Sequence, residues 1–226
     1  MSVMRHFPIN LDIRDKPVTV IGGGLVAARK CSALLEAGAR VTVVSPELAP
    51  ALSAMRDRGE ISHRERGFIP GDCNGAFLVF AATDSHEANQ AVAEEARSFA
   101  ILADIADDPD LGSFTLPAVM RRGDLQIAVS TGGKSPALAR LIREQLEELY
   151  GPEYGRTLEL LGRLREKLLT EKGNSAYNKQ IFNALAERLP ALVKCASADE
   201  IDDLLRTMCG PGVTLAGLGL TGKDPE

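Results

Sequence analysis

Three consecutive glycines, Gly22, Gly23 and Gly24, follow an apolar run at residues 18–21 and precede a stretch with helical periodicity. With Ala27 they form the pattern Gly-x-Gly-x-x-Ala. In such a turn the first glycine permits a tight bend, the second lets the backbone approach a pyrophosphate, and the small alanine allows close helix packing. The start of the helix also favours an anion. The sequence therefore predicts a dinucleotide site, rather than a merely structural turn, formed by Gly22, Gly23, Gly24, Leu25 and Val26.

The residue that would distinguish NAD from NADP is not evident. An acidic side chain about 20 residues further on, at the end of the second strand, usually binds the adenosine ribose. Ser45 stands there, with Glu47 two residues later. A serine neither repels a 2′-phosphate nor binds it, so the residues alone leave the choice open. Thr83 and Asp84 follow a later apolar run and are the next residues able to contact a cofactor, although Asp84 is equally suited to cap a helix.

The elements that must position these residues alternate between short β-branched runs and amphipathic stretches from residue 17 to residue 105. The runs that suit strands are residues 17–21, 40–44, 61–64, 76–82 and 100–105, and those that suit helices are 27–37, 47–58 and 85–98. Continuous apolar runs such as 77–82 are typical of parallel strands covered by helices on both faces. We therefore predict an α/β fold with a Rossmann-type parallel sheet over residues 1–112.

The pattern changes after Asp107. Two runs around an Arg-Arg-Gly-Asp turn, at residues 113–120 and 125–130, predict a hairpin, and Ser135 followed by Pro136 predicts the start of a helix. From residue 153 the periodicity is helical almost throughout. The sequence thus predicts a small α+β segment over residues 113–150 and a helical C-terminal domain over 151–226.

Composition argues against several other classes of protein. The chain has 226 residues, of which 45% are hydrophobic and 25% charged, and a net charge of -5, which suits neither a disordered chain nor a dedicated nucleic-acid binder. Four cysteines lack CxxC spacing, and His6, His63 and His86 are not at ligand spacing, so no metal site is predicted. Because no signal segment or membrane-spanning run is evident, we expect a cytoplasmic protein that binds neither membranes nor nucleic acids.

Several short motifs, taken in order, resemble the precorrin-2 dehydrogenase family, the dehydrogenase unit of siroheme synthase. The resemblance is close over residues 4–150 and looser beyond. The segments that carry it are Phe7-Pro8-Ile9-Asn10-Leu11, Gly22-Gly23-Gly24 with Ala27-Ala28-Arg29-Lys30, Ala81-Ala82-Thr83-Asp84, Ala106-Asp107-Asp108-Pro109, Ser113-Phe114-Thr115-Leu116-Pro117-Ala118 and Ser130-Thr131-Gly132-Gly133-Lys134-Ser135-Pro136-Ala137-Leu138-Ala139. It implies oxidation of precorrin-2 to sirohydrochlorin with NAD as cofactor; some members also insert iron into sirohydrochlorin, which the sequence does not decide.

The same resemblance assigns catalysis to Asp107. Spacing alone favours a mere turn at Asp107-Asp108-Pro109. In the family an aspartate at this position is implicated in catalysis, where a carboxylate could take a proton while NAD takes a hydride, or could hold substrate nitrogens. Here Asp104 replaces the more usual asparagine, and two adjacent carboxylates would raise the pKa of one of them. Which aspartate acts is therefore open, with Asp107 preferred.

The implied substrate carries acetate and propionate groups, which require cations. Arginine forks bind carboxylates bidentately, so Arg121, Arg122 and Lys134 are predicted to bind substrate together with Asp104. For each cation the alternative is a solvated face or a dimer contact.

Two other functions stay open at this point, an NAD-binding regulatory module without turnover and a dehydrogenase of another small acid. In the family the segment after the Rossmann domain exchanges between two protomers. The resemblance therefore implies a homodimer with residues 113–150 at its interface, and a helical C-terminal domain that covers the substrate pocket.

Overall fold

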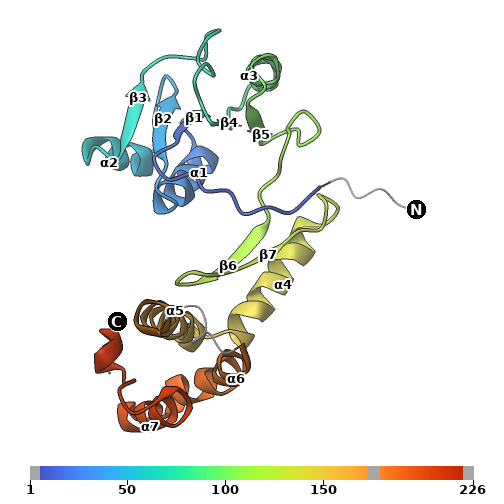
Figure 1. Ribbon diagram of the computed structural model, residues 1–226. Helices are drawn as coiled ribbons and strands as arrows, with labels where there is room; N and C mark the ends of the chain where they lie inside the picture. Colours follow the sequence, from blue (N-terminus) through green and yellow to red (C-terminus); the bar gives the residue numbers. More distant parts are fainter. Residues whose placement is uncertain (1–5, 173–178, 221–226) are drawn as a thin grey trace. The chain divides into compact units, whose positions relative to one another are not determined.

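The computed structural model describes residues 6–172 and 179–220, and the chain divides between Leu116 and Pro117 into two compact units (Figure 1). The first unit alternates strands with helices, as the sequence predicts. Its elements are β1 (Pro17–Ile21), α1 (Leu25–Glu36), β2 (Arg40–Val44), α2 (Pro50–Asp57), β3 (Ile61–Arg64), β4 (Leu78–Ala81), α3 (His86–Ser98) and β5 (Leu102–Ile105).

The five strands of the first unit form one parallel sheet in the order β3-β2-β1-β4-β5. In register, Val18 of β1 lies opposite Val41 on one side and Leu78 on the other. The strand order reverses between β1 and β4, and ligands of such sheets bind outside the carboxyl ends of the strands at this switch point. The predicted Rossmann-type sheet is confirmed, and its topology indicates where a ligand would bind.

Alternate residues of each central strand face opposite layers of the first unit. Val18 and Val20 of β1 belong to the apolar cluster that includes Ala27 and Cys31 of α1 and Leu52 of α2. The alternate strand positions, such as Ile21 and Val79, belong to a second cluster with Val92, Ala93 and Ala96 of α3. Burial on both faces explains why the central strands are continuous apolar runs.

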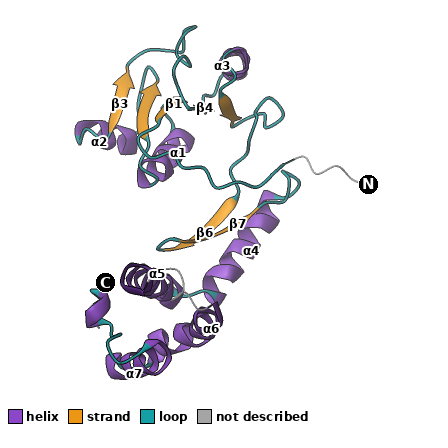
Figure 2. Ribbon diagram, viewed as in Figure 1, coloured by secondary structure: helices purple, strands orange, loops and turns teal. Residues whose placement is uncertain are grey.

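The second unit begins with two antiparallel strands, β6 (Ala118–Arg122) and β7 (Leu125–Val129), which confirm the predicted hairpin. Helices follow it, as Figure 2 shows. They are α4 (Pro136–Leu149), α5 (Pro152–Lys172), α6 (Lys179–Cys195) and α7 (Ala198–Cys209), with a short 3-10 turn at Ala216–Leu218. Leu164, Leu189 and Leu205, one each from α5, α6 and α7, are among the residues of their common core.

The hairpin and the C-terminal helices belong to the same compact unit, although the sequence predicts separate segments at 113–150 and 151–226. Gly155, in the first turn of α5, lies so close to the hairpin that an added Cβ would be 2.8 Å from the carbonyl oxygen of Arg122. This tight packing explains why the two predicted segments share one unit. None of the described helices is both long and apolar enough to cross a membrane.

Candidate active site

A groove of about 740 Å³ lies at the carboxyl ends of β1, β2 and β4 in the first unit. Its lining contains seven of the eight residues predicted to bind a cofactor, namely Gly22, Gly23, Gly24, Leu25, Ser45, Thr83 and Asp84. The eighth, Val26, lies in the first turn of α1 and does not line the groove. The groove therefore coincides with the switch point of the sheet.

The three positions of the turn require glycine for different reasons. Gly22 has a φ of +121°, and a Cβ there would lie 2.2 Å from the carbonyl oxygen of Ala82. A Cβ on Gly23 would lie 1.9 Å from the carbonyl oxygen of Glu47. A Cβ on Gly24 would meet no described atom within 4 Å. The fold itself requires the first two glycines, whereas the third leaves open space beside the backbone.

The start of α1 provides donors in that open space. Gly24 is the N-cap residue of the helix, and no described side chain caps it with a hydrogen bond. The first amide groups of a helix have no partner within the helix and carry partial positive charge, which favours an anion such as a diphosphate. The residues present therefore fit the diphosphate of a nicotinamide dinucleotide.

At the end of β2, Ser45 and Glu47 have different surroundings. The Ser45 hydroxyl is buried and donates a hydrogen bond to the backbone oxygen of Glu47 at 2.7 Å, and the Ser45 carbonyl lies 2.9 Å from Nε2 of His63. Glu47 is exposed and lines the groove. Ser45 thus shapes the turn, while the carboxylate near the usual ribose position belongs to Glu47.

The buried carboxylate of Asp72, which the sequence did not indicate, stabilises a segment that lines the groove. Asp72 accepts hydrogen bonds from Arg64 Nη1 at 2.7 Å, from Arg66 Nη1 at 2.6 Å and from the backbone N–H of Ile69. The hydrogen bond from Arg66 is the main reason that the pKa of Asp72 falls to about 2. These contacts order the segment that presents Gly67 and Phe68 to the groove.

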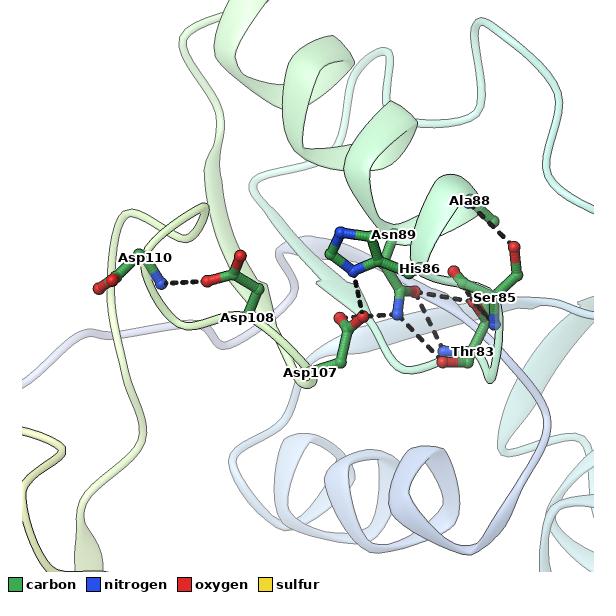
Figure 3. Close-up of polar contacts among 8 residues, drawn as sticks. All are labelled: Thr83, Ser85, His86, Ala88, Asn89, Asp107, Asp108 and Asp110. Atoms are coloured by element: carbon green, nitrogen blue, oxygen red, sulfur yellow. Dashed lines mark hydrogen bonds and ion pairs between the residues drawn. The ribbon is translucent and has the colours of Figure 1, made fainter.

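Asp107 lies beyond β5 in a polar network with the first turn of α3 (Figure 3). Its Oδ1 accepts a hydrogen bond from Asn89 Nδ2 at 2.8 Å, and its Oδ2 lies 2.9 Å from His86 Nδ1. Asn89 is fully buried and also bonds to Thr83, which lines the groove: Nδ2 donates to the Thr83 carbonyl, and Oδ1 accepts from the Thr83 N–H and hydroxyl. The network therefore links the predicted catalytic carboxylate to the groove.

The network keeps Asp107 ionised. Burial acts to raise the pKa of Asp107, but hydrogen bonds from His86 and Asn89 outweigh it and hold that pKa below its ordinary value. The same carboxylate raises the pKa of His86, chiefly through their hydrogen bond. The pair therefore favours an imidazolium beside a carboxylate at mildly acidic pH.

The three neighbouring aspartates have different surroundings. Asp108 accepts the backbone N–H of Asp110 at 3.0 Å, and in Figure 3 it points away from Asp107. Asp108 thus forms the turn that spacing alone suggested, whereas Asp107 belongs to the network.

Asp104 lies on the face of the sheet that α1 covers. Its buried carboxylate pairs with Lys30 of α1, whose Nζ lies 5.2 Å from the centre of the Phe80 ring. Asp104 and Asp107 therefore bind different partners, and a role for Asp104 in substrate binding stays a prediction.

Of the predicted cations, Arg122 has a structural role in the second unit. Its guanidinium donates to the backbone oxygens of Tyr150 at 2.9 Å and Glu147 at 3.0 Å, at the C-terminal end of α4. These carbonyls have no partner within the helix, so Arg122 caps it. Arg121 and Lys134 are exposed in the same unit, and their binding of substrate stays a prediction.

The sequence contains a signal that Asn89 belongs to a polar network, although Asn89 is not among the predicted site residues. Asn89 stands in register with Val92, Ala93 and Ala96 on the buried stripe of α3, where a polar side chain must find partners. His86 is not among the predicted site residues, and only its spatial neighbour Asp107 marks it. Among the described residues, no three His, Cys, Asp or Glu side chains gather as a metal site would require.

A parallel sheet with a glycine turn and a groove at the switch point defines the first unit as a dinucleotide-binding α/β domain. Comparison with known proteins agrees. The family model described as putative NAD(P)-binding matches residues 9–118, and the model described as sirohaem biosynthesis protein central matches residues 122–149.

Curated relatives and a solved structure extend this comparison. The chain is 39% identical to siroheme synthase 3 of Aeromonas hydrophila over 96% of its own length and 48% of the relative, and 41% identical to the siroheme synthase of Methylobacillus flagellatus over 79% of its length and 38% of the relative. A solved structure described as SirC, precorrin-2 dehydrogenase, has a TM-score of 0.74 at 23% identity, covers 90% of this chain and 98% of that one, and shows the same fold.

The chain belongs to the family of siroheme synthase N-terminal units. It spans about half the length, or less, of the curated relatives described above.

Proposed function

We propose that this protein oxidises precorrin-2 to sirohydrochlorin with NAD as hydride acceptor, in siroheme biosynthesis. The observation that carries the proposal is the attachment of Asp107, through buried Asn89, to Thr83 in the wall of the dinucleotide groove. Family membership supplies the substrate class, because the relatives are siroheme synthases. A carboxylate fixed beside a dinucleotide groove suits a reaction that removes a hydride and a proton from one molecule.

Each part of the groove has a role in this proposal. The backbone amides at Gly24 and Leu25, at the start of α1, hold the diphosphate, and Ser45 and Glu47 lie where the adenosine ribose binds. The exposed carboxylate of Glu47 would repel a 2′-phosphate, which supports NAD rather than NADP. When bound, NAD supplies the hydride acceptor.

The chain itself supplies charge and proton transfer. Asp107, held as an anion, lies beside the groove to serve proton removal or to bind the pyrrole nitrogens of the substrate. Arg121 and Lys134 are proposed to bind the acetate and propionate groups, because Arg and Lys side chains form strong, charge-assisted hydrogen bonds with carboxylates. The structural role of Arg122 in capping α4 makes it the weakest of the predicted substrate ligands.

The test is to add NAD and freshly made precorrin-2 to the purified protein and to follow NADH absorbance together with the sirohydrochlorin spectrum. Asp107→Ala is expected to lower the rate by about a hundredfold or more, the usual contribution of general acid–base catalysis, because the anion that serves proton removal beside the groove is lost. Asp108→Ala is the matched control, since Asp108 only forms the adjacent turn, and it should keep most of the activity. Absence of NADH formation, or equal rates for Asp107→Ala and wild type, would contradict the proposal and favour a regulatory module or another substrate.

Iron insertion into sirohydrochlorin is a second candidate activity. Insertion displaces two pyrrole protons, and the ionised Asp107 could assist their removal in the same site. When ferrous iron is added to protein and sirohydrochlorin under anaerobic conditions, the spectrum of the metal-free macrocycle should change to that of the iron-bound one. This change should be faster than in the reaction without protein. A rate equal to that without protein would exclude this activity.

We also propose a cytoplasmic homodimer with residues 113–150 at its interface. The support is the surface of α4, where Leu138, Leu141 and Leu149 are 47%, 51% and 69% exposed. Exposed leucines on one amphipathic helix are typical of a protein interface. Light scattering at working concentration should give twice the chain mass, and a monomer would contradict this part of the proposal.

A further inference from the structure

We propose that His86 Nε2, rather than Asp107, accepts the proton that the substrate loses on oxidation, and that Asp107 orients and stabilises the imidazole. The inference rests on the proposed function and assigns one step of it. It is argued from the hydrogen bonds that bind Asn89, Asp107 and His86 together in Figure 3.

The orientation of the Asn89 amide follows from its backbone partner. The Thr83 N–H can only donate and the Thr83 carbonyl can only accept, so Asn89 Oδ1 must face the first and Nδ2 the second, at 3.2 Å and 3.0 Å. Nδ2 therefore also presents a hydrogen to Asp107 Oδ1 at 2.8 Å. Because Asn89 is fully buried and packed in α3, this donor is fixed.

Asp107 is consequently a poor base. One carboxylate oxygen accepts from Asn89 and the other faces His86, and both contacts favour the anion. Protonating Asp107 would weaken two hydrogen bonds at once. The group best able to gain a proton in this network is its imidazole partner.

His86 has the geometry of an oriented base. Nδ1 faces the Asp107 carboxylate at 2.9 Å, so the hydrogen of neutral imidazole lies on Nδ1 and the lone pair on Nε2. A carboxylate in this position holds the tautomer and stabilises the imidazolium that forms, as in serine hydrolases. The side chain is 62% exposed, and the part of the chain that the structure describes places no hydrogen-bond partner on Nε2, which leaves this nitrogen open to solvent and free to accept a proton.

The step balances as an ordinary proton abstraction. A hydride leaves the substrate for NAD with its electron pair, a second substrate bond to hydrogen breaks, and its electrons remain in the macrocycle as a new double bond. The proton forms an N–H bond at Nε2, and the imidazolium later releases a proton to water.

The charged groups around His86 set the pH at which it can act. Asp107 bonds to it, Asp108 lies on the same loop beyond β5, and Glu87 adjoins it on α3; the negative charges of all three stabilise the imidazolium. The pKa of His86 is accordingly raised above its ordinary value, chiefly through the hydrogen bond with Asp107, which makes the neutral imidazole a stronger base. Since only neutral imidazole accepts a proton, activity should fall as pH decreases through that pKa.

The kinetic test compares two isosteric variants, His86→Asn and Asp107→Asn, by the single-turnover rate of NADH formation across pH. Asn at position 86 keeps a donor near Nδ1 but has no basic nitrogen. We expect His86→Asn to lose about a hundredfold in rate, with an unchanged Kd for NAD, and to lose the acidic limb of the profile. Asp107→Asn should keep that limb but shift it to lower pH, because the imidazolium loses its partner.

Two further measurements strengthen this test. Added imidazole should partly restore the His86→Ala rate, because the exposed site admits it, whereas His6→Asn, the matched histidine control, should match wild type. Independently of turnover, ¹⁵N NMR of the free protein should show the Nδ1–H tautomer of His86 and a lower His86 pKa in Asp107→Asn.

The outcomes separate this inference from the proposed function. If wild type forms NADH and His86→Asn does so at the same rate with the acidic limb intact, His86 is not the acceptor and this inference is wrong, while the proposed function stands. An Nε2–H tautomer would also overturn it. If wild type forms no NADH from precorrin-2, the proposed function fails, and this inference fails with it.

Discussion

Asn89 has no exposed surface, yet both polar atoms of its side chain are hydrogen-bonded, to Thr83 and to Asp107. An unpaired amide in such a place would cost free energy, so complete pairing is the condition for a polar residue on the buried stripe of α3. One side chain thus ties the loop after β4 to the loop after β5. The position of the Asp107 carboxylate depends on a helix and not on its own loop alone.

At the residue scale, the glycine turn gives a matched pair of variants. Gly24→Ala should lower the affinity for NAD about tenfold or more, because its Cβ would occupy the space beside the helix start. It should lower the free energy of unfolding by no more than about 1 kcal/mol, the usual cost of alanine for glycine at an N-cap. Calorimetric NAD binding and urea unfolding followed by circular dichroism measure the two effects.

Gly22→Ala is the contrasting variant. Its φ of +121° and the 2.2 Å approach to Ala82 should lower stability by at least about 2 kcal/mol, whatever ligand is present. Equal stability losses for the two variants, or wild-type NAD binding by Gly24→Ala, would contradict the assignment of Gly24 to the ligand.

At the scale of elements, the segment that carries Gly67 and Phe68 is held by one buried carboxylate. The side chain of Asp72 is 2% exposed and forms ion pairs with two arginines. Arg64 is the last residue of β3, and Arg66 lies just after that strand. The segment therefore depends on Asp72 remaining charged.

Asp72→Asn should lower the free energy of unfolding by about 2 kcal/mol at pH 7, because the native pKa of about 2 lies below the ordinary value of 3.8. A lowered pKa gives stability that is complete above pH 3.8 and is lost as pH falls through about 2. The difference from wild type in urea unfolding should accordingly shrink over that range.

Asp57→Asn is the control for this variant, since Asp57 pairs with Arg56 on the surface and should contribute less than about 0.5 kcal/mol. A loss for Asp72→Asn that is the same at pH 7 and pH 2 would show that its charge is not the cause.

The end of α4 is the second element held by a single side chain. Arg122→Lys should lower stability by about 1 to 2 kcal/mol, because one ammonium cannot bond both carbonyls that the guanidinium fork bonds. Arg163→Lys, at an exposed position of α5, should change little. If Arg122→Lys instead raised the KM for precorrin-2 with stability unchanged, Arg122 would be a substrate ligand and not chiefly a cap.

At the scale of the whole molecule, the chain has separate cores. Two apolar clusters lie on the two faces of the parallel sheet, and a third joins α5, α6 and α7. All residues of the dinucleotide groove belong to the first unit.

Binding of NAD should therefore slow amide hydrogen exchange selectively. We expect protection at residues 22–28 and 44–50 and little change in α6 and α7, measured by mass spectrometry on the full chain with and without NAD. NADP at the same concentration is the control and should protect less, because the proposed ribose position is beside the Glu47 carboxylate, which lines the groove. Equal protection of both units would contradict the placement of the cofactor.

The sequence by itself determined the α/β fold of the first unit and the glycine turn. These depend on local rules: apolar runs form buried strands, and a tight strand-to-helix turn requires glycine at positions such as Gly22. Element bounds differ from the predicted ones by a few residues, as at β4, which is Leu78–Ala81 where residues 76–82 are predicted.

Only the tertiary structure decided which polar groups act together. Spacing could not separate Asp104, Asp107 and Asp108, because their partners come from elsewhere in the chain: Lys30 lies 74 residues from Asp104, and His86 lies 21 residues from Asp107. Which face of the sheet each helix covers determines these partners, and partners determine whether a carboxylate is a structural ion pair, a turn former or part of a site. Local sequence does not encode that choice, because it depends on contacts formed across the folded sheet.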